Sequence, residues 1–130
     1  MGTLHKNALG VCTSGKCCVI IDRNLGENEI LNKRLVALEK IGIIDLGSNN
    51  ARLVLVKIFP GGQFVVFDEL KESVRLGQDM ERDGFLKPAR VVQTIKTLKS
   101  FRKLCDAYQV DKIIAVGTAA VRRAKNQKGF

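Results

Sequence analysis

Apolar runs broken by short polar stretches predict strands and turns over the middle of the chain. The run Ile41–Ile44 is β-branched and of strand length, and it ends at the carboxylate Asp45. Small polar residues follow, and a second apolar run begins at Ala51. Such a pattern is typical of a buried strand, a tight turn and another strand. We therefore expect Asp45 to end a buried strand, where a charge is costly without a cation or donors near it.

The next residues extend this pattern into an antiparallel meander. A strand from Ala51 to Phe59 reaches Pro60-Gly61-Gly62-Gln63, which has proline and glycine at the central positions that favour a turn. Residues from Gln63 to Leu70 are again mostly apolar. Because a short turn joins neighbouring antiparallel strands, we expect three consecutive strands in one sheet.

A long helix and a fourth strand follow. Pro88 is suited to a first helical position. Apolar residues then recur every three or four positions, and we expect this face to lie on the sheet: Val91, Val92, Ile95, Leu98, Phe101, Leu104, Cys105 and Tyr108. Lys112–Val116 is a second buried strand, and a crossover through a helix returns it parallel to the first strand and beside it.

Two turns should therefore meet at one end of the sheet. The turn after Asp45 and the turn at Thr118 both follow the carboxyl ends of neighbouring strands, where open α/β sheets bind ligands. Thr118 offers a hydroxyl and the amides of a helix start, and Arg122 lies one turn further. Hydroxyl, amide and guanidinium groups together favour an anion.

The turn after Asp45 has the composition of a phosphate-binding loop. Gly47 permits a close approach of the backbone, while Ser48 and Asn49 add side-chain donors. Such a turn can hold a phosphate, with the aspartate left for a hydrated Mg²⁺. A hairpin with an ordinary Asx-type turn explains the same residue types equally well.

The first 40 residues follow a different pattern. Residues 1–16 mix small polar residues and lysine without periodicity, and we expect them to be mobile. Residues 26–40 carry four apolar side chains at helical spacing opposite charged ones, which predicts a short amphipathic helix.

Composition restricts the class of protein. The chain has 130 residues, 45% hydrophobic and 27% charged, which is ordinary for one modest globular domain. We find no run long enough for a membrane span and no signal peptide, so we expect a cytoplasmic protein without a membrane partner. The four cysteines lack paired C-x₂-C spacing, which favours reduced thiols over a metal site.

The net charge of +9 is uneven along the chain. Residues 87–130 carry eleven basic and two acidic side chains, whereas residues 41–86 carry five basic and seven acidic ones. A basic second half suggests an anionic partner. Lys96, Lys99 and Lys103 form a stripe on the predicted helix, and a solvated face explains them better than a nucleic-acid footprint.

Three motifs carry a resemblance to a known family. They are Asp45-Leu-Gly47-Ser48-Asn49-x-x-Arg52-Leu, Lys71-Glu-Ser-Val-Arg75-Leu-Gly77 and Val116-Gly-Thr118-Ala-Ala-Val-Arg122-Arg-Ala-Lys-Asn126. Together they resemble the opening half of the exopolyphosphatase/guanosine pentaphosphate phosphohydrolase (Ppx/GppA) family. The resemblance implies an α/β fold with a mixed sheet of ribonuclease-H-like (actin-like ATPase) type, here its amino-terminal lobe. Residues 41–130 would be the first part of the phosphatase domain, truncated at its carboxyl end, and residues 1–40 an extension.

The resemblance also implies roles for single residues. Asp45 would hold Mg²⁺, and the phosphate-binding residues would be Gly47, Ser48, Asn49, Arg52, Arg75, Thr118 and Arg122. This chain departs from the family at three positions. The family often has serine in place of Asn50 and of Ala119, and an acidic residue or glutamine in place of Arg123. The glutamate that activates water in the family, and a second glycine-rich phosphate loop, would lie beyond Phe130. We therefore expect no catalytic base in this chain and no activity from it alone.

The activity implied for the complete protein is removal of the terminal phosphate from inorganic polyphosphate. Two alternatives are a guanosine pentaphosphate 5′-phosphatase and a non-catalytic module that binds polyphosphate or the alarmone. A weaker alternative is a basic nucleic-acid-binding domain. We expect the complete protein to be a homodimer.

Overall fold

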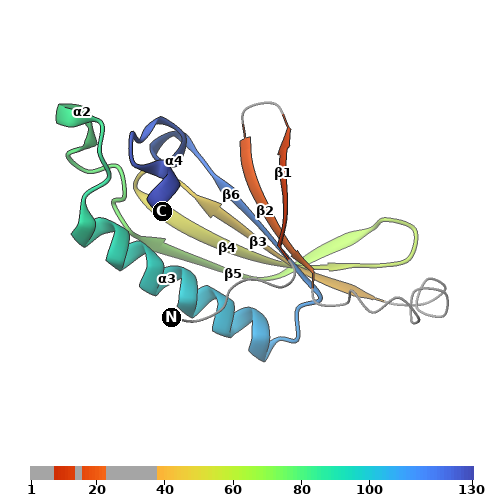
Figure 1. Cartoon of the computed structure of the whole chain (residues 1–130). Coiled ribbons are helices and arrows are strands. Elements are labelled where there is room, and N and C mark those ends of the chain that lie inside the picture. Colours follow the sequence, from red (N-terminus) through yellow and green to blue (C-terminus); the bar gives the residue numbers. More distant parts are fainter. Residues whose placement is uncertain (1–7, 14–15, 23–37) are drawn as a thin grey trace.

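The computed structural model describes residues 8–13, 16–22 and 38–130, the first two segments by their backbone (Figure 1). Six strands form one sheet in the order β1-β2-β6-β3-β4-β5. The strands are β1 (Ala8–Thr13), β2 (Lys16–Asp22), β3 (Glu39–Leu46), β4 (Asn50–Ile58), β5 (Phe64–Ser73) and β6 (Lys112–Gly117). The helices are α2 (Met80–Asp83), α3 (Pro88–Ala107), α4 (Ala119–Arg123) and a 3₁₀ turn, Gln127–Gly129.

The predicted meander is confirmed in β3, β4 and β5, which pair antiparallel in sequence order. The amide of Gly62 donates to the carbonyl of Phe59 at 3.1 Å, which closes the turn between β4 and β5. Gly61 has φ 96°, a conformation that glycine adopts without steric cost. β5 runs on to Ser73, past the expected end at Leu70, so a longer edge strand leads towards the site.

The predicted crossover is confirmed as well. β6 returns parallel to β3, with Ile43 opposite Ile114 and Leu46 opposite Gly117. α3 begins at Pro88, as the sequence predicted, and provides the crossover. The ends of β3 and β6 therefore lie side by side, and the turns that follow them are neighbours.

The face of α3 that packs on the sheet differs in part from the predicted one. Phe101 and Cys105 are buried as expected, but the other buried positions are Thr94 and Thr97. The prediction was wrong for Val92, Ile95 and Tyr108, whose side chains are 53%, 37% and 38% exposed. Thr94 is buried at low cost because its hydroxyl donates to the carbonyl of Arg90 at 2.8 Å.

Gly42 on β3 leaves room for Cys105 of α3. A Cβ atom at Gly42 would lie 2.9 Å from Sγ of Cys105, so a side chain would displace the helix or the thiol. The core between helix and sheet consists mainly of alternate residues of β3 and β4 with residues of α3 and of the loops: Ile44, Leu46, Ala51, Leu53, Leu55, Val74, Leu76, Leu86, Phe101, Cys105, Val110 and Ile113. Ala120 and Ala124 add α4 to the same core.

The opposite face of the sheet is open. In Figure 1, α3 lies along one face, and none of the described helices covers the other. Ile43 on β3 is accordingly 38% exposed. Asp45 shares this open face and is exposed, so the expectation of a carboxylate at the end of a buried strand was wrong. Side chains alternate along a strand, and Asp45 points away from α3 while Ile44 and Leu46 point towards it.

The amino-terminal part also differs from the sequence-based prediction. β1 and β2 form an antiparallel hairpin, and β2 continues the sheet by pairing antiparallel with β6. The expectation of a mobile start over residues 1–16 was therefore wrong for Ala8–Thr13 and Lys16. The predicted helix over residues 26–40 falls mostly outside the described residues, and its last two residues belong to β3. No described helix combines the length and the hydropathy that crossing a membrane requires.

Candidate functional site

The turn between β3 and β4 is the centre of the candidate site. The amide of Gly47 donates to the carbonyl of Asn50 at 2.9 Å, which closes the turn over Ser48 and Asn49. A Cβ atom at Gly47 would lie 3.1 Å from that carbonyl oxygen, so a side chain would crowd the turn. Steric crowding therefore explains why glycine occupies this position.

The segment after β5 docks on this turn through its backbone. The amides of Val74 and Arg75 donate to the carbonyl of Asn49 at 2.9 and 2.8 Å, and the amide of Gly77 donates to the carbonyl of Ser48 at 2.8 Å. A Cβ atom at Gly77 would lie 3.1 Å from Cβ of Ser48. Two motifs far apart in the sequence are therefore one local structure.

Arg75 adopts a backbone conformation that is uncommon for arginine. Its φ is 47°, in the left-handed region, which costs on the order of 1 kcal/mol for a residue with a side chain. Its amide is held by Asn49, and its carbonyl accepts from the amide of Gln78 at 3.0 Å. These contacts fix the direction in which the guanidinium leaves the loop.

Thr118 attaches the start of α4 to the same turn. Both its amide and its hydroxyl donate to the carbonyl of Leu46, each at 3.0 Å. The amide of Arg122 in turn donates to the carbonyl of Thr118 at 3.1 Å. The sequence suggested the amide and the hydroxyl of Thr118 as donors to an anion, but both join β3 to α4. Thr118 therefore positions the residues next to it.

A first groove runs along the open sheet face beside the turn and has a volume of about 500 Å³. It is lined by Asp45, Gly47, Ser48, Asn49, Asn50, Arg52, Glu69 and Lys71. Asp45 pairs with Arg52 across β3 and β4, and Arg52 pairs with Lys71 across β4 and β5. One carboxylate and two cations therefore stand in a row next to the turn.

Arg52 is engaged by an acidic neighbour in this groove. Its guanidinium lies 2.6 Å from Oε1 of Glu69, and both side chains are about half exposed. The hydrogen bond from Arg52 holds the pKa of Glu69 below its ordinary value. The hydrogen bond to Glu69, with smaller contributions that include the charge of Asp45, raises the pKa of Arg52.

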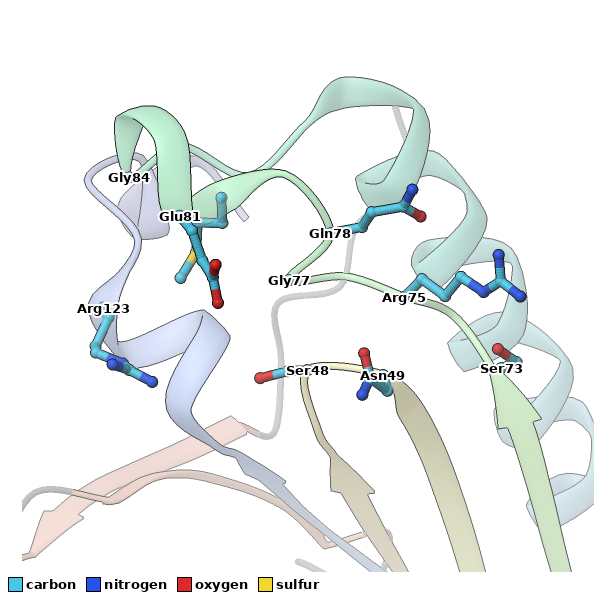
Figure 2. Close-up of a pocket in the computed structure, with 10 residues that line it drawn as sticks. Ser48, Asn49, Ser73, Arg75, Gly77, Gln78, Glu81, Gly84 and Arg123 are labelled. Carbon is cyan, nitrogen blue, oxygen red and sulfur yellow. The ribbon is translucent and has the colours of Figure 1, made fainter.

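A second groove lies on the other side of the turn and has a volume of about 720 Å³. Ser48 and Asn49 line both grooves. The remaining lining comes from the loop after β5, from α2 and from α4: Ser73, Arg75, Gly77, Gln78, Met80, Glu81, Gly84 and Arg123. In Figure 2 the guanidinium of Arg123 points towards Ser48, and the carboxylate of Glu81 points into the space between them.

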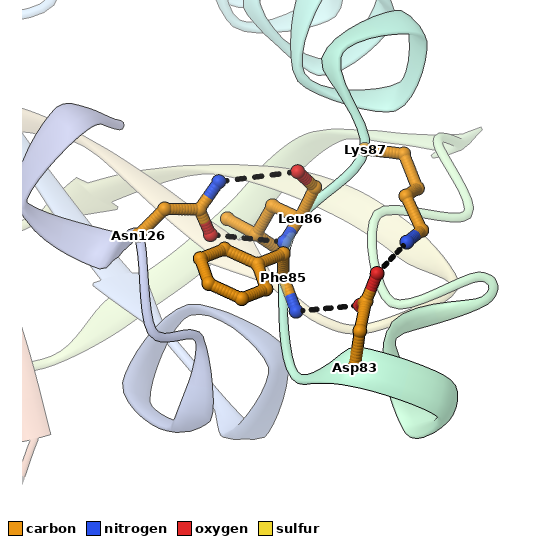
Figure 3. Close-up of polar contacts among 5 residues, drawn as sticks. All are labelled: Asp83, Phe85, Leu86, Lys87 and Asn126. Atoms are coloured by element: carbon orange, nitrogen blue, oxygen red, sulfur yellow. Dashed lines mark hydrogen bonds and ion pairs between the residues drawn. The ribbon is translucent and has the colours of Figure 1, made fainter.

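The far wall of the second groove is tied to the carboxyl-terminal segment through Asn126 (Figure 3). The side-chain amide of Asn126 donates to the carbonyl of Leu86 at 3.1 Å, and its Oδ1 accepts from the amide of Leu86 at 2.9 Å. The amide of Lys125 donates to the carbonyl of Gly84 at 2.9 Å. These bonds set the distance between α2, which carries Glu81, and α4, which carries Arg123.

An ion pair reinforces the same wall. Asp83 accepts from the amide of Phe85 at 3.0 Å and from Nζ of Lys87 at 2.5 Å (Figure 3). The hydrogen bond from Lys87, followed by the one from the Phe85 amide, lowers the pKa of Asp83. The stabilisation from this pair is therefore present above the ordinary pKa of an aspartate and is lost as the pH falls through the lowered one.

Most of the candidate residues are brought together by this arrangement. Five of them line the first groove: Asp45, Gly47, Ser48, Asn49 and Arg52. Arg75 lines the second groove, and Thr118 lies at the junction. Arg122 is exposed on α4 and lines neither groove.

Sequence reasoning missed four charged residues of the grooves, namely Glu69, Lys71, Glu81 and Arg123. Glu69 and Lys71 are alternate residues of β5 that share the face of Arg52, which follows from strand alternation once the register is known. Arg123 attracted attention only as a departure from the family pattern.

The side chains that line the first groove suit a hydrated Mg²⁺ ion. They do not form a site that encloses a metal with protein ligands alone. Within residues 38–130, whose side chains the structure describes, no group of three or more histidine, cysteine, aspartate or glutamate side chains converges. Mg²⁺ commonly keeps several waters and is bound by one or two carboxylates together with substrate phosphates. Asp45, exposed beside the turn, is suited to that role when an anion occupies the groove.

The sequence matches a known family over more than half of its length. Residues 54–130 match the Ppx/GppA phosphatase family. Over 93 residues the chain is 32% identical to the bifunctional 3-dehydroquinate synthase/phosphatase of Fusobacterium nucleatum, which covers 67% of this chain and 14% of that protein.

Comparison of the fold gives similar neighbours. The chain resembles the Ppx/GppA family member of Aquifex aeolicus with a TM-score of 0.68 and 33% identity, over 72% of this chain and 30% of that one. It resembles an exopolyphosphatase from Cytophaga hutchinsonii with a TM-score of 0.66 and 32% identity, over 70% and 29% of the two chains. These neighbours confirm the expected fold class, a mixed sheet of the actin-like type. The chain spans less than a third of the length of each of these proteins.

Proposed function

Because the chain belongs to the Ppx/GppA phosphatase family, we propose that it supplies the phosphate-binding and Mg²⁺-binding side of a phosphohydrolase site. The substrate we propose is inorganic polyphosphate, from which the complete site removes the terminal phosphate. In this reading the chain itself binds the substrate, and the group that activates the attacking water belongs to another part of the complete protein.

One observation carries this proposal: Asp45 and Arg52 stand side by side on the open sheet face, next to the turn at Ser48 and Asn49. An anion at this turn meets donors from the turn and a guanidinium from β4. A cation held by Asp45 would lie against the same anion. This combination suits a phosphate group and its metal ion better than it suits an uncharged ligand.

The chemistry of phosphoryl transfer needs these functions. The transferred group develops negative charge over its oxygens, so most of the catalysis comes from positioning and from charge stabilisation. Arg52 and Lys71 would bind phosphate oxygens, and the turn would orient them. A Mg²⁺ ion bound through Asp45 would neutralise charge on the terminal phosphates.

Binding measurements on the 130-residue chain test this proposal. Titration calorimetry with a short polyphosphate, with and without Mg²⁺, should show tighter binding in the presence of the metal. Asp45→Asn should remove the increase in polyphosphate affinity that Mg²⁺ causes. The melting temperature should stay unchanged, because Asp45 is exposed. Asp79→Asn is the matched control, since Asp79 lines neither groove and asparagine tolerates its left-handed conformation at φ 62°.

Two results would contradict the proposal. One is an increase in polyphosphate affinity on addition of Mg²⁺ that persists in Asp45→Asn. The other is tighter binding of random duplex DNA than of polyphosphate at the same ionic strength, with the steep salt dependence of backbone contacts. That result would favour a nucleic-acid-binding domain.

A further inference from the structure

The turn at Ser48 and Asn49 separates two grooves of different charge. The first groove contains two carboxylates, Asp45 and Glu69, and two cations, Arg52 and Lys71, and Glu69 is paired with Arg52. The second groove contains two arginines, Arg75 and Arg123, and one carboxylate, Glu81. A ligand that extends beyond one phosphate can therefore pass from the first groove over the turn into a more basic one.

The two arginines of the second groove are available to a ligand. Neither Arg75 nor Arg123 has an ion-pair partner among residues 38–130, in contrast to Arg52 and Arg102. Figure 2 shows the guanidinium of Arg123 directed at the hydroxyl of Ser48 across the groove. Arg75 and Arg123 line the groove from different elements, the loop after β5 and α4, and the guanidinium of Arg75 points away from Arg123 in Figure 2.

The construction of the groove supports a binding role. Arg75 is held in the left-handed region, and such strained positions cluster at binding sites. The opposite wall is fixed by the paired hydrogen bonds between Asn126 and Leu86. The spacing between α2 and α4 is consequently fixed, which reduces the ordering that a ligand would have to impose.

We propose that the second groove binds the phosphates that follow the terminal one, so that a linear polyphosphate of three or more phosphates crosses the turn and ends in the first groove. Arg123 is the residue that determines this preference for length, because its guanidinium fork can hold two phosphate oxygens. Glu81 opposes the ligand by its charge. This inference rests on the proposed phosphate-binding function.

A series of ligands of increasing length tests this inference on the 130-residue chain. Pyrophosphate, tripolyphosphate and a polyphosphate of about fifteen phosphates are titrated in Mg²⁺. Wild-type affinity should rise with the length of the ligand. Arg123→Gln should lower the affinity for the two longer ligands by about tenfold, which is the effect of one charge-assisted contact. Its affinity for pyrophosphate should change little. Arg82→Gln removes the same charge from α2 at a position that lines neither groove, and it should retain the affinity for every length.

A second variant should have the opposite effect. Glu81→Gln removes the carboxylate that faces Arg123, so affinity for tripolyphosphate should rise by roughly threefold at low ionic strength. Glu72→Gln is its control, because Glu72 is exposed on β5 and lines neither groove. Melting temperatures of all variants establish that they are folded.

The possible failures are distinguishable. If wild type and Arg123→Gln bind long and short ligands with the same ratio of affinities, the second groove does not bind the chain, although the phosphate site remains. If Arg82→Gln lowers the affinity for the longer ligands as much as Arg123→Gln does, only the net charge matters and the inference is wrong. If wild-type protein binds none of the three ligands, both the inference and the proposed function are wrong.

Discussion

Glu69 and an anionic ligand compete for the guanidinium of Arg52. The ion pair at 2.6 Å occupies the side of Arg52 that faces β5, while Asp45 lies on its other side. Arg52 is thus bound to Glu69 and has Asp45 as its cross-strand neighbour. Its contribution to phosphate binding depends on how readily it leaves Glu69.

Replacing Glu69 should therefore strengthen anion binding. In Glu69→Gln, Arg52 loses its charged partner and the groove loses one negative charge, so affinity for pyrophosphate should rise by roughly threefold. Titration calorimetry at constant ionic strength measures this change. Glu72→Gln should show no rise, because Glu72 pairs with Ala51 and lies on the other face of β5.

The same pair predicts a dependence on pH. The pKa of Glu69 is lowered in the folded protein, so the pair is intact at neutral pH and is lost as the pH falls through that lowered pKa. Wild-type affinity should approach that of Glu69→Gln over this acidic range. A constant ratio of the two affinities down to the lowered pKa would show that Arg52 does not bind the ligand.

Gly42 on β3 faces Cys105 on α3. Gly42→Ala should place a methyl group 2.9 Å from Sγ of Cys105 and lower the free energy of unfolding by about 1–3 kcal/mol, the usual cost of overpacking. Denaturant unfolding measures the change. Gly129→Ala is the control, because a Cβ atom there would meet nothing within 4 Å.

The cause can be assigned with a double substitution. In a Cys105→Ala background the sulfur is gone, and Gly42→Ala should cost much less than in wild type. Equal costs in both backgrounds would place the strain elsewhere, for example at Leu55 or Val110, whose side chains lie 3.6 Å from the same position.

The β1–β2 hairpin protects an edge of the sheet. β2 pairs with β6 along the whole length of β6, from Cys17 opposite Gly117 to Asp22 opposite Lys112. Without the hairpin, the apolar strand β6 would be an edge strand, and exposed apolar edges pair with other chains. Deletion of residues 1–22 should therefore raise the fraction of dimers and larger species in analytical ultracentrifugation, whereas deletion of residues 1–7 should not. If the chain without residues 1–22 is monomeric, pairing with β2 is not needed to keep β6 from associating with other chains.

In the part of the chain that the structure describes, helices cover one face of the sheet and leave the other open, and the candidate site lies at the end of the open face. Within the described residues the groove beside Asp45 contains one further carboxylate, Glu69, which is bound to Arg52. Among the residues that line this groove, Asp45 and Glu69 are the acidic ones. This arrangement favours binding of phosphate over its hydrolysis.

We therefore predict that the 130-residue chain binds polyphosphate with Mg²⁺ but releases no phosphate above the uncatalysed rate. Phosphate release over hours is the measurement, with a complete Ppx/GppA family member as the positive control. Turnover comparable to that control would mean that these residues contain a full catalytic site. It would also direct attention to Glu69 as the base.

The sequence alone determined the local features of this protein. The β-branched runs, the turn at Gly47 and the start of α3 at Pro88 depend on short-range preferences, and all are confirmed. The parallel pairing of β6 with β3 followed from connection rules, which need no side-chain detail. Because these rules bring the turns after β3 and β6 together, the position of the candidate site was predictable too.

The tertiary structure alone decided which side chains face the site. The rotation of α3 buries Thr94 in place of Val92, because a threonine whose hydroxyl bonds its own helix packs as an apolar residue. The open face exposes Asp45, since no described helix covers it. The direction of α4 brings Arg123 to the second groove and leaves Arg122 outside both grooves. Neighbouring arginines have the same local preferences, and only long-range packing through Thr118 and Asn126 distinguishes them.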